Sequence, residues 1–243
     1  MNIVFTMAGK YERFKLFGNK IPKYLIPLGK HTVLWHIIAT VHNLNLEKVN
    51  LFLIANKNDV DFYPVITSII KDFGINQENI KFINDTKSQL ETAVRGLEIL
   101  SNQINDAEPV SFMNIDTVLY NRRDYFETLR NKTNFDGLID LFPGNSSEYS
   151  YANTDENNNL VTDIADKTKI SPYACSGLYS YKKTTDFFEK ARRLVSSKQD
   201  ANFTYFYKSI IEEGLRVGSI KQNQSSDTIV LGTPEEYVVN LHR

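Results

Sequence analysis

The chain has 243 residues and carries 28 Lys and Arg against 29 Asp and Glu, so its formal net charge is −1. This balance excludes the basic surface typical of nucleic-acid-binding proteins, and a hydrophobic content of 42% excludes a disordered chain. The single cysteine, Cys175, excludes an internal disulfide and favours a reducing compartment. Since no apolar run approaches the ~20 residues of a membrane span, we expect a cytoplasmic protein that binds neither membrane nor nucleic acid.

Apolar runs and stretches of helical period alternate through the first half of the chain. The strand-like runs lie at 3–7, 49–56, 79–85 and 109–116. The stretches that place apolar residues every three or four positions lie at 32–44, 61–73 and 91–100. Strands that are apolar along nearly their whole length, with helices between them, are typical of a parallel sheet covered on both faces. We therefore predict an α/β fold with an open sheet.

After about residue 135 the strand-like runs follow one another without helices between them. They lie at 136–143, 148–155, 159–167 and 174–182, and helical periods return at 184–196 and 202–213. This order predicts a small antiparallel extension of the sheet, which would form a second wall beside the carboxyl ends of the parallel strands. Because no linker rich in Gly, Ser or Pro separates the halves, we expect a single domain, 1–243, with subregions at 1–134 and 135–243.

The loop after the first strand carries a glycine and two cations. Gly9 lets the backbone approach a ligand phosphate, and Lys10 and Arg13 supply positive charge. The loop matches neither GxGxxG nor GxxxxGK(S/T), which excludes the two common phosphate-loop motifs. Taken alone, the loop is also compatible with a turn that carries a solvated lysine.

Two further positions suit phosphate and metal chemistry. Lys23 lies between Pro22 and Pro27, which stiffen the backbone that carries it, although a surface lysine in a proline-kinked loop fits the same pattern. Asp116 ends the fourth apolar run, where a carboxylate faces the ligand crevice of a parallel sheet and can share Mg²⁺ with substrate phosphates. The alternative for Asp116 is an N-cap of a helix near 122–131.

Four motifs stand in a defined order along the chain. They are MAGKYERF at 7–14, PKYLIPL at 22–28, NID at 114–116 and IADKTKISPYACSGLYSY at 164–181. This order resembles the nucleotidyltransferases that join a nucleoside triphosphate to a phosphorylated acceptor and release pyrophosphate. The segments NFTYFYKSIIEEG at 202–214 and VLGTPEEYV at 230–238 also resemble the last helix pair and closing turn of that family. The resemblance implies a Rossmann-like three-layer α/β/α sandwich of the glycosyltransferase-A type, with a mixed, mostly parallel sheet.

The resemblance also implies roles for individual residues. Arg13 would hold the leaving pyrophosphate, Lys23 the phosphates at the reacting phosphorus, Asp116 a Mg²⁺ ion, and Lys167 the phosphate of the acceptor. The implied nucleotide-binding residues are Ala8, Gly9 and Lys10 and, for the base, the segment 88–93, chiefly the backbone of Gln89 and Leu90 with the Thr92 side chain nearby. The implied acceptor-binding residues are Glu12, Lys167 and Gly177. In-line attack at phosphorus needs positioned charge more than acid–base catalysis. The histidines agree with this, since none has metal or triad spacing: His31, His36, His42 and His242.

The chain departs from the family pattern at two places. Tyr11 and Glu12 stand where members usually carry a second glycine and then Ser or Thr before the loop arginine. Glu12 either recognises an ammonium group of an unusual acceptor, or it points to solvent or pairs with Lys15. The second metal carboxylate that many members carry just before the closing glycine turn is also missing. Asp227, a few residues upstream, becomes the candidate ligand, with a plain turn residue as the equal alternative.

We therefore expect a Mg²⁺-dependent enzyme. Overall likeness to short bacterial cytidylyltransferases of surface-polysaccharide synthesis favours CTP, while uridylyl or guanylyl transfer stays open. Phosphocholine, phosphoglutamine or a sugar 1-phosphate could be the acceptor. A choline acceptor needs an aromatic box. The second half offers the tyrosines for one, although they are as often packing residues: Tyr149, Tyr151, Tyr173, Tyr179 and Tyr181.

Two other functions stay open at this point. A nucleotide-sugar-dependent glycosyltransferase would use Asp59-Val60-Asp61 as a DxD motif, although helix capping explains this pair more simply. A non-catalytic nucleotide-binding protein would explain the altered loop at Tyr11 and Glu12. An apolar helix face could also form a homodimer.

Overall fold

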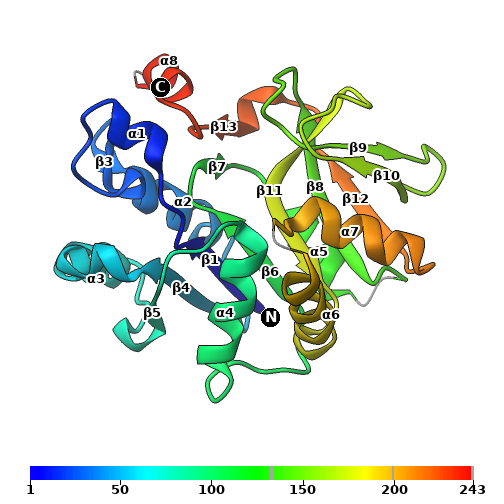
Figure 1. Ribbon diagram of the computed structural model, residues 1–243, viewed down its shortest axis with the longest axis horizontal. Coiled ribbons are helices and arrows are strands. Elements are labelled where there is room, and N and C mark those ends of the chain that lie inside the picture. The colour runs from blue at the N-terminus through cyan, green and yellow to red at the C-terminus, as the bar shows by residue number, and fades with distance from the viewer. Residues whose placement is uncertain (132–133, 199, 242–243) are drawn as a thin grey trace.

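A nine-stranded mixed sheet runs through the centre of the computed structural model, which describes residues 1–131, 134–198 and 200–241 (Figure 1). Its first-half strands are β1 (Asn2–Met7), β4 (Asn50–Asn56), β5 (Ile80–Ile83) and β6 (Val110–Asn114). β1 lies between β4 and β6 and is parallel to both, and β5 lies parallel beside β4. The four apolar runs of the first half therefore form the parallel half-sheet that the sequence predicts.

The second-half strands extend the same sheet. They are β8 (Gly137–Pro143), β9 (Tyr151–Thr154), β10 (Val161–Ala165), β11 (Tyr173–Tyr181) and β12 (Val217–Lys221). β11 joins the two halves, because it pairs antiparallel with β6 as well as with β8 and β9. β12 pairs in parallel with β8 and is not predicted by the sequence patterns. The antiparallel extension is confirmed.

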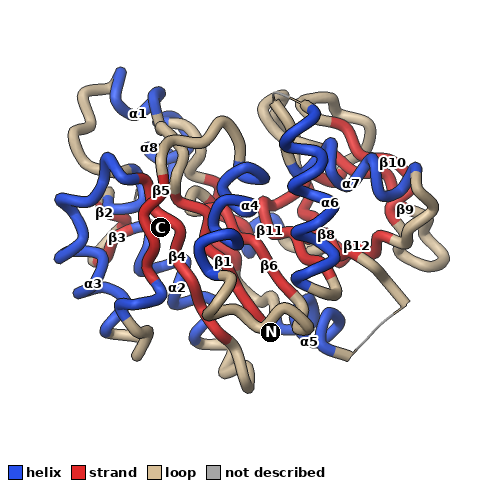
Figure 2. Tube along the Cα trace, turned by 60° about the horizontal axis from the view of Figure 1, so that its bottom comes forward, coloured by secondary structure: helices blue, strands red, loops and turns tan. Residues whose placement is uncertain are grey.

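Helices cover both faces of the sheet, as Figure 2 shows with the strands in red between them. α2 (Val33–His42), α3 (Tyr63–Lys71) and α5 (Arg123–Arg130) pack on one face, and α4 (Gln89–Leu100), α6 (Thr184–Ser197) and α7 (Phe203–Glu212) on the other. Alternation along β1 separates two cores, since Ile3, Phe5 and Met7 belong to the first and Val4 to the second. The helices follow the predicted periods because their apolar faces fill these cores.

Short elements surround the carboxyl ends of the parallel strands, at the top of Figure 1. They are α1 (Glu12–Leu16), the 3-10 helix η1 (Lys23–Leu25), the paired strands β7 (Thr117–Leu119) and β13 (Thr228–Val230), and α8 (Pro234–Asn240). The remaining elements are the paired strands β2 (Pro27–Leu28) and β3 (His31–Thr32), and the 3-10 helices η2 (Lys57–Phe62), η3 (Gln77–Asn79) and η4 (Ser225–Asp227). These elements are too short to show a period in the sequence.

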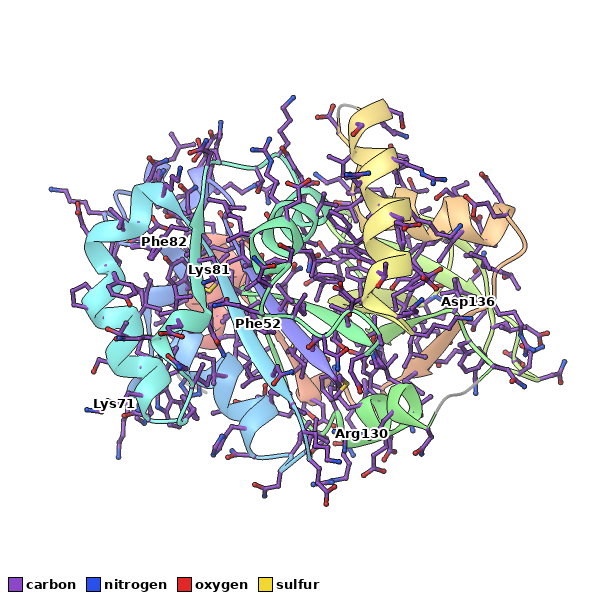
Figure 3. The ribbon with its side chains drawn as sticks, turned by 90° about the horizontal axis from the view of Figure 1, so that it is seen from below. Phe52, Lys71, Lys81, Phe82, Arg130 and Asp136 are labelled. Atoms are coloured by element: carbon purple, nitrogen blue, oxygen red, sulfur yellow. The ribbon has the colours of Figure 1, made fainter. Side chains whose placement is uncertain are left out.

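The amino-terminal end of the parallel strands, opposite to these short elements, faces the viewer in Figure 3. Arg130, at the end of α5, and Asp136, just before β8, lie at this end of the sheet. The carboxyl ends of the parallel strands lie at the other end of the sheet. Within the described ranges, no helix combines the length and the apolar character needed to cross a membrane.

Candidate functional site

Two cavities adjoin at the carboxyl ends of the parallel strands. The first has a volume of about 630 Å³ and is walled by the β1–α1 loop, the start of α4 and the end of β6. The second has a volume of about 310 Å³ and is walled by β11, the β8–β9 loop and the segment before α8. Arg13, Asn114, Asp116 and Gly232 line both cavities, so these residues mark the junction.

An ion pair lies at this junction. Lys23 Nζ is 2.6 Å from Asp116 Oδ2, and the two side chains are 15% and 25% exposed. The Leu231 amide donates to the Asp116 carbonyl at 2.7 Å, which ties the segment after β13 to the end of β6. The helix-cap alternative for Asp116 is wrong, because Arg122 occupies the N-cap position of α5. One cation and one carboxylate therefore meet where the cavities join.

Two further cations converge on a single carboxylate. Arg13 Nη2 lies 2.7 Å, and Lys167 Nζ 3.6 Å, from Glu148 Oε2. The hydrogen bond from Arg13 and the charge of Lys167 lower the pKa of Glu148. The three residues come from distant parts of the chain and all line the second cavity. The Glu148 carboxylate therefore shows that a single anionic group in this cavity can contact Arg13 and Lys167 at once. No pattern in the sequence predicts Glu148, because it lies in an irregular loop between strands.

Four of the six residues that the resemblance assigns to nucleotide binding line the first cavity. They are Gly9, Lys10, Gln89 and Thr92. Ala8 and Leu90 are fully buried and line neither cavity. The Ala8 carbonyl accepts a hydrogen bond from Asn56 Nδ2 at 3.2 Å, and the Leu90 side chain belongs to the core beneath α4. These two residues support the cavity wall from behind.

A hydrogen bond connects the walls of the two cavities. Gln89, the first residue of α4, donates through Nε2 to the Gly177 carbonyl at 3.3 Å. Gly177 has a φ of +87°, and a Cβ at this position would overlap the side chain of Asn114. Glycine is therefore required here for β11 to pass close to the end of β6.

The structure places the two candidate metal ligands in different regions. Asp116 lines both cavities, whereas Asp227 lines neither. Asp227 lies just before β13, where its carbonyl accepts a hydrogen bond from the Tyr120 amide at 2.9 Å. The carboxylate beside Asp116 is instead Glu236. A Cβ on Gly232 would lie 3.3 Å from Glu236 Oε2 and 3.7 Å from Asp116 Oδ2, so both oxygens border one space. In the part of the chain that the structure describes, no group of three or more His, Cys, Asp or Glu side chains is arranged to hold a metal.

Asp59 and Asp61 form no DxD site at these cavities. Asp59 is buried inside η2 and accepts hydrogen bonds from the hydroxyls of Tyr11 and Tyr24, whereas Asp61 is exposed. The helix-cap explanation is also wrong, because Asn56 is the N-cap of η2 and Phe62 is the N-cap of α3. Asp59 is therefore a buried acceptor, a role that its position in the sequence does not indicate.

The tyrosines proposed for an aromatic box are only partly available. Tyr149 and Tyr179 line the second cavity, together with Phe142. Tyr179 is nevertheless buried, as are Tyr151 and Tyr181, and its ring stacks on Phe203 with centroids 4.6 Å apart. Tyr173 lines neither cavity. The cavity thus offers a few aromatic rings and not a complete tyrosine cage.

The remaining candidates show no nucleophile or histidine site. Glu12 lines the first cavity, is exposed, and forms no ion pair within the described residues. Burial raises the pKa of the Cys175 thiol to about 12, so this cysteine stays protonated and is not a nucleophile. The His36 ring hydrogen-bonds to the Leu28 carbonyl at 2.8 Å, and His242 lies outside the described residues.

Solved structures share this fold along nearly the whole chain. The nucleoside-diphosphate-sugar pyrophosphorylase from Vibrio cholerae RC9 is similar with a TM-score of 0.85 and 24% identity, over 99% of this chain and 100% of that chain. A UDP-glucose pyrophosphorylase complexed with UDP-glucose is similar with a TM-score of 0.76 and 14% identity, over 99% of this chain and 97% of that chain. No family model and no curated protein matches the sequence. The two likenesses confirm the three-layer α/β fold.

Proposed function

We propose that this chain is a nucleotidyltransferase, which moves a nucleoside monophosphate from an NTP to a small phosphorylated acceptor and releases pyrophosphate. One observation carries the proposal: the Lys23–Asp116 pair lies where a cavity of about 630 Å³ meets one of about 310 Å³. A nucleoside triphosphate in the larger cavity and an acceptor in the smaller one would bring their phosphates together at this pair. Both similar structures are named as pyrophosphorylases, which supports the reaction class.

The reaction needs aligned phosphates and neutralised charge more than proton transfer. An oxygen of the acceptor phosphate forms a bond to the α-phosphorus of the NTP. The bond from that phosphorus to the bridging oxygen breaks, and pyrophosphate leaves with the electron pair. In the proposal Lys23 neutralises the α-phosphoryl oxygens, Arg13 binds the leaving pyrophosphate and Lys167 binds the acceptor phosphate. An ionised phosphate is already nucleophilic, so no general base is required.

Asp116 is the residue that we propose to hold Mg²⁺. Its carboxylate already binds a cation, the Lys23 ammonium, and borders the space beside Gly232. Glu236 borders the same space, and its carboxylate is fixed by a tyrosine hydroxyl at 2.7 Å and a backbone amide at 2.9 Å. We therefore assign Glu236, instead of Asp227, as the second carboxylate. When bound, Mg²⁺ would neutralise phosphate oxygens while keeping several waters.

The affinity for Mn²⁺, used in place of Mg²⁺ and measured by electron paramagnetic resonance in the presence of CTP, tests this assignment without turnover. Glu236→Gln should weaken Mn²⁺ binding about tenfold, in the range known for groups that support a metal site. Glu235→Gln is the matched control, because Glu235 is the exposed neighbour on α8. Weaker binding in Asp227→Asn with no change in Glu236→Gln would show that the assignment is wrong.

The second cavity limits the class of acceptor. It offers the half-buried ring of Tyr149 and the carboxylates of Glu148 and Glu236. Aromatic rings can stack on a sugar or hold an ammonium group by cation–π attraction, and carboxylates add to the attraction for an ammonium group. We therefore propose phosphocholine, phosphoglutamine or a sugar 1-phosphate as the first acceptors to test. CTP is the first nucleotide to test, because the resemblance to short cytidylyltransferases favours it.

Pyrophosphate release tests the proposed reaction. Each of the four NTPs is combined with Mg²⁺ and with sugar 1-phosphates, phosphocholine, phosphoethanolamine or phosphorylated amino acids. We expect release only when a nucleotide and an acceptor are both present. Asp116→Asn should lower kcat ~100- to 1,000-fold, by analogy with the loss of one oxyanion donor. Asp227→Asn is the matched control. Full activity in Asp116→Asn, or no release with any pair, would refute the proposal.

A further inference from the structure

A buried carboxylate lies between the two segments that carry the proposed phosphate-binding cations. Asp59, in η2, is 4% exposed, and each of its oxygens accepts a hydrogen bond from a tyrosine hydroxyl. Tyr11 donates to Oδ1, and Tyr24 donates to Oδ2 at 3.0 Å. We call these three residues the loop clamp. Asp59 lines neither cavity, so any effect on the site passes through its two partners.

The first partner, Tyr11, begins the turn that carries Arg13. Its φ of 39° and ψ of 43° lie in the left-handed region, which residues other than glycine adopt when surrounding contacts hold them there. The Tyr11 carbonyl accepts hydrogen bonds from the amides of Phe14 at 3.1 Å and Lys15 at 3.3 Å, which starts α1. Lys15 Nζ also lies 4.9 Å from the centroid of the Tyr11 ring. The hydrogen bond to Asp59 therefore fixes the start of the turn from which Arg13 extends.

The second partner, Tyr24, is adjacent to Lys23. Tyr24 is fully buried, while Lys23 reaches out from the same 3-10 turn to contact Asp116. The Leu25 amide donates to the Pro22 carbonyl at 2.8 Å and closes this turn. Anchoring Tyr24 thus fixes the backbone that carries Lys23.

The end of β4 holds the same loop at its beginning. Asn56 is 2% exposed and donates through Nδ2 to the Ala8 carbonyl at 3.2 Å and to Asp85 Oδ1 at 2.9 Å. Asn56 lies three residues before Asp59. The short segment 56–59, at the end of β4 and the start of η2, therefore contacts the phosphate loop at two points.

The protonation states suit these hydrogen bonds. Burial, together with the nearby Asp59 carboxylate, raises the pKa of both Tyr11 and Tyr24, so both hydroxyls keep their protons and donate. Burial raises the pKa of Asp59 too, and the hydrogen bonds from the two tyrosines act to lower it. The carboxyl group is therefore stabilised as an acceptor by the same hydroxyls that it anchors.

We propose that Asp59 is a positioning residue, which holds the Arg13 turn and the Lys23 turn in a fixed relation before any substrate binds. The inference rests on the proposed function for the roles of the two cations. With the clamp formed, the loop is ordered during folding, so less conformational entropy is lost when a polyphosphate binds. Tyr11 would then supply by a side-chain anchor the left-handed turn that a glycine adopts freely.

Hydrogen exchange on the free protein tests the clamp without any reaction. Tyr11→Phe should raise amide exchange in 9–20 about tenfold, and Tyr24→Phe should do so in 21–28, because local opening becomes easier. Asp59→Ala should raise exchange in both segments. Asp59→Asn should exchange more slowly than Asp59→Ala, because the asparagine side chain can accept a hydrogen bond from one tyrosine hydroxyl and donate one to the other. Tyr63→Phe is the matched control, since Tyr63 follows η2 directly and packs against Phe82 with ring centroids 5.9 Å apart.

The affinity of each variant for pyrophosphate, measured by titration calorimetry, tests whether the clamp affects binding. Tyr11→Phe should weaken binding about tenfold, the change that 1.4 kcal/mol produces. Because this variant leaves Asp59 Oδ1 without its donor, the unfolding temperature should also fall by several degrees, and binding is measured well below that transition. Unchanged exchange in Tyr11→Phe and Asp59→Ala would overturn the clamp. Raised exchange with unchanged affinity would overturn the positioning role. If the variants weaken pyrophosphate binding but the wild-type protein releases none from any NTP, the clamp is supported and the proposed function is refuted.

Discussion

Removal of Arg122 should destabilise the protein strongly, because this side chain supports the strands that frame Asp116. Arg122 and Asp140 are 1% and 0% exposed, and Arg122 Nε lies 3.0 Å from Asp140 Oδ2. The same guanidinium donates to the Asp227 carbonyl at 3.0 Å and to the Thr228 hydroxyl at 2.5 Å, which anchors β13. Arg122→Met leaves the Asp140 carboxylate buried without its cation, and such a loss costs about 3–5 kcal/mol.

Urea unfolding at 25 °C, followed by circular dichroism, measures this loss. Thermal unfolding should show a fall of roughly 6–20 °C, at about 2–4 °C for each kcal/mol in a chain of this size. Arg122→Met with Asp140→Leu should recover part of the stability, because no unpaired charge remains. Burial raises the pKa of Asp140, so the penalty in Arg122→Met should shrink as the pH falls through that pKa and the carboxyl becomes neutral. A loss under about 1 kcal/mol, or a double variant no better than the single one, would refute the reasoning.

Three further predictions concern other parts of the molecule. Gly177→Ala should lower the free energy of unfolding by about 3 kcal/mol or more, as measured by thermal unfolding, because a left-handed φ and an overlap with the Asn114 side chain coincide. Gly18→Ala, with a φ of +82° and open space, should cost less, and equal losses would contradict this reasoning. Glu148→Gln should tighten pyrophosphate binding about threefold at low ionic strength, because the carboxylate competes for two cations; weaker binding would contradict it. Asp136→Asn should cost about 1.5–3 kcal/mol at neutral pH. Although burial acts to raise it, hydrogen bonds from Lys182 and a backbone amide lower the pKa of Asp136. This contribution should therefore be lost as the pH falls through that lowered pKa, and a loss in Asp136→Asn that is unchanged in acid would contradict the sign.

Apolar periodicity predicts most of the sheet and its helices, because burial determines both. The parallel strands are covered on both faces and therefore appear as continuous apolar runs. β12 shows no such run, because Gly218 and Ser219 occupy its centre. Gly218 interrupts the apolar run that would indicate a strand, but it is required for the packing of β12, because a Cβ at this position would overlap the ring of Phe135.

The candidate site is predictable from the sequence where a candidate residue directly follows a strand or a turn with a clear signal. Asp116 and Lys23 are of this kind, and the structure brings them together. Asp227 is misplaced because the register of two three-residue strands decides its position, and strands this short carry no pattern. Glu148 and Glu236 are missed because a loop and a helix end approach the site only in the folded chain.

The identity of the reaction product is the most direct test of nucleotidyl transfer by this chain. The protein is incubated with CTP, Mg²⁺ and a phosphorylated acceptor from the panel, and the products are followed by phosphorus NMR and mass spectrometry. We predict equal amounts of pyrophosphate and of an acceptor joined to CMP through a diphosphate, both lost in Asp116→Asn. Release of inorganic phosphate without a joined product, or glycosyl transfer from a nucleotide-sugar, would contradict the proposed reaction.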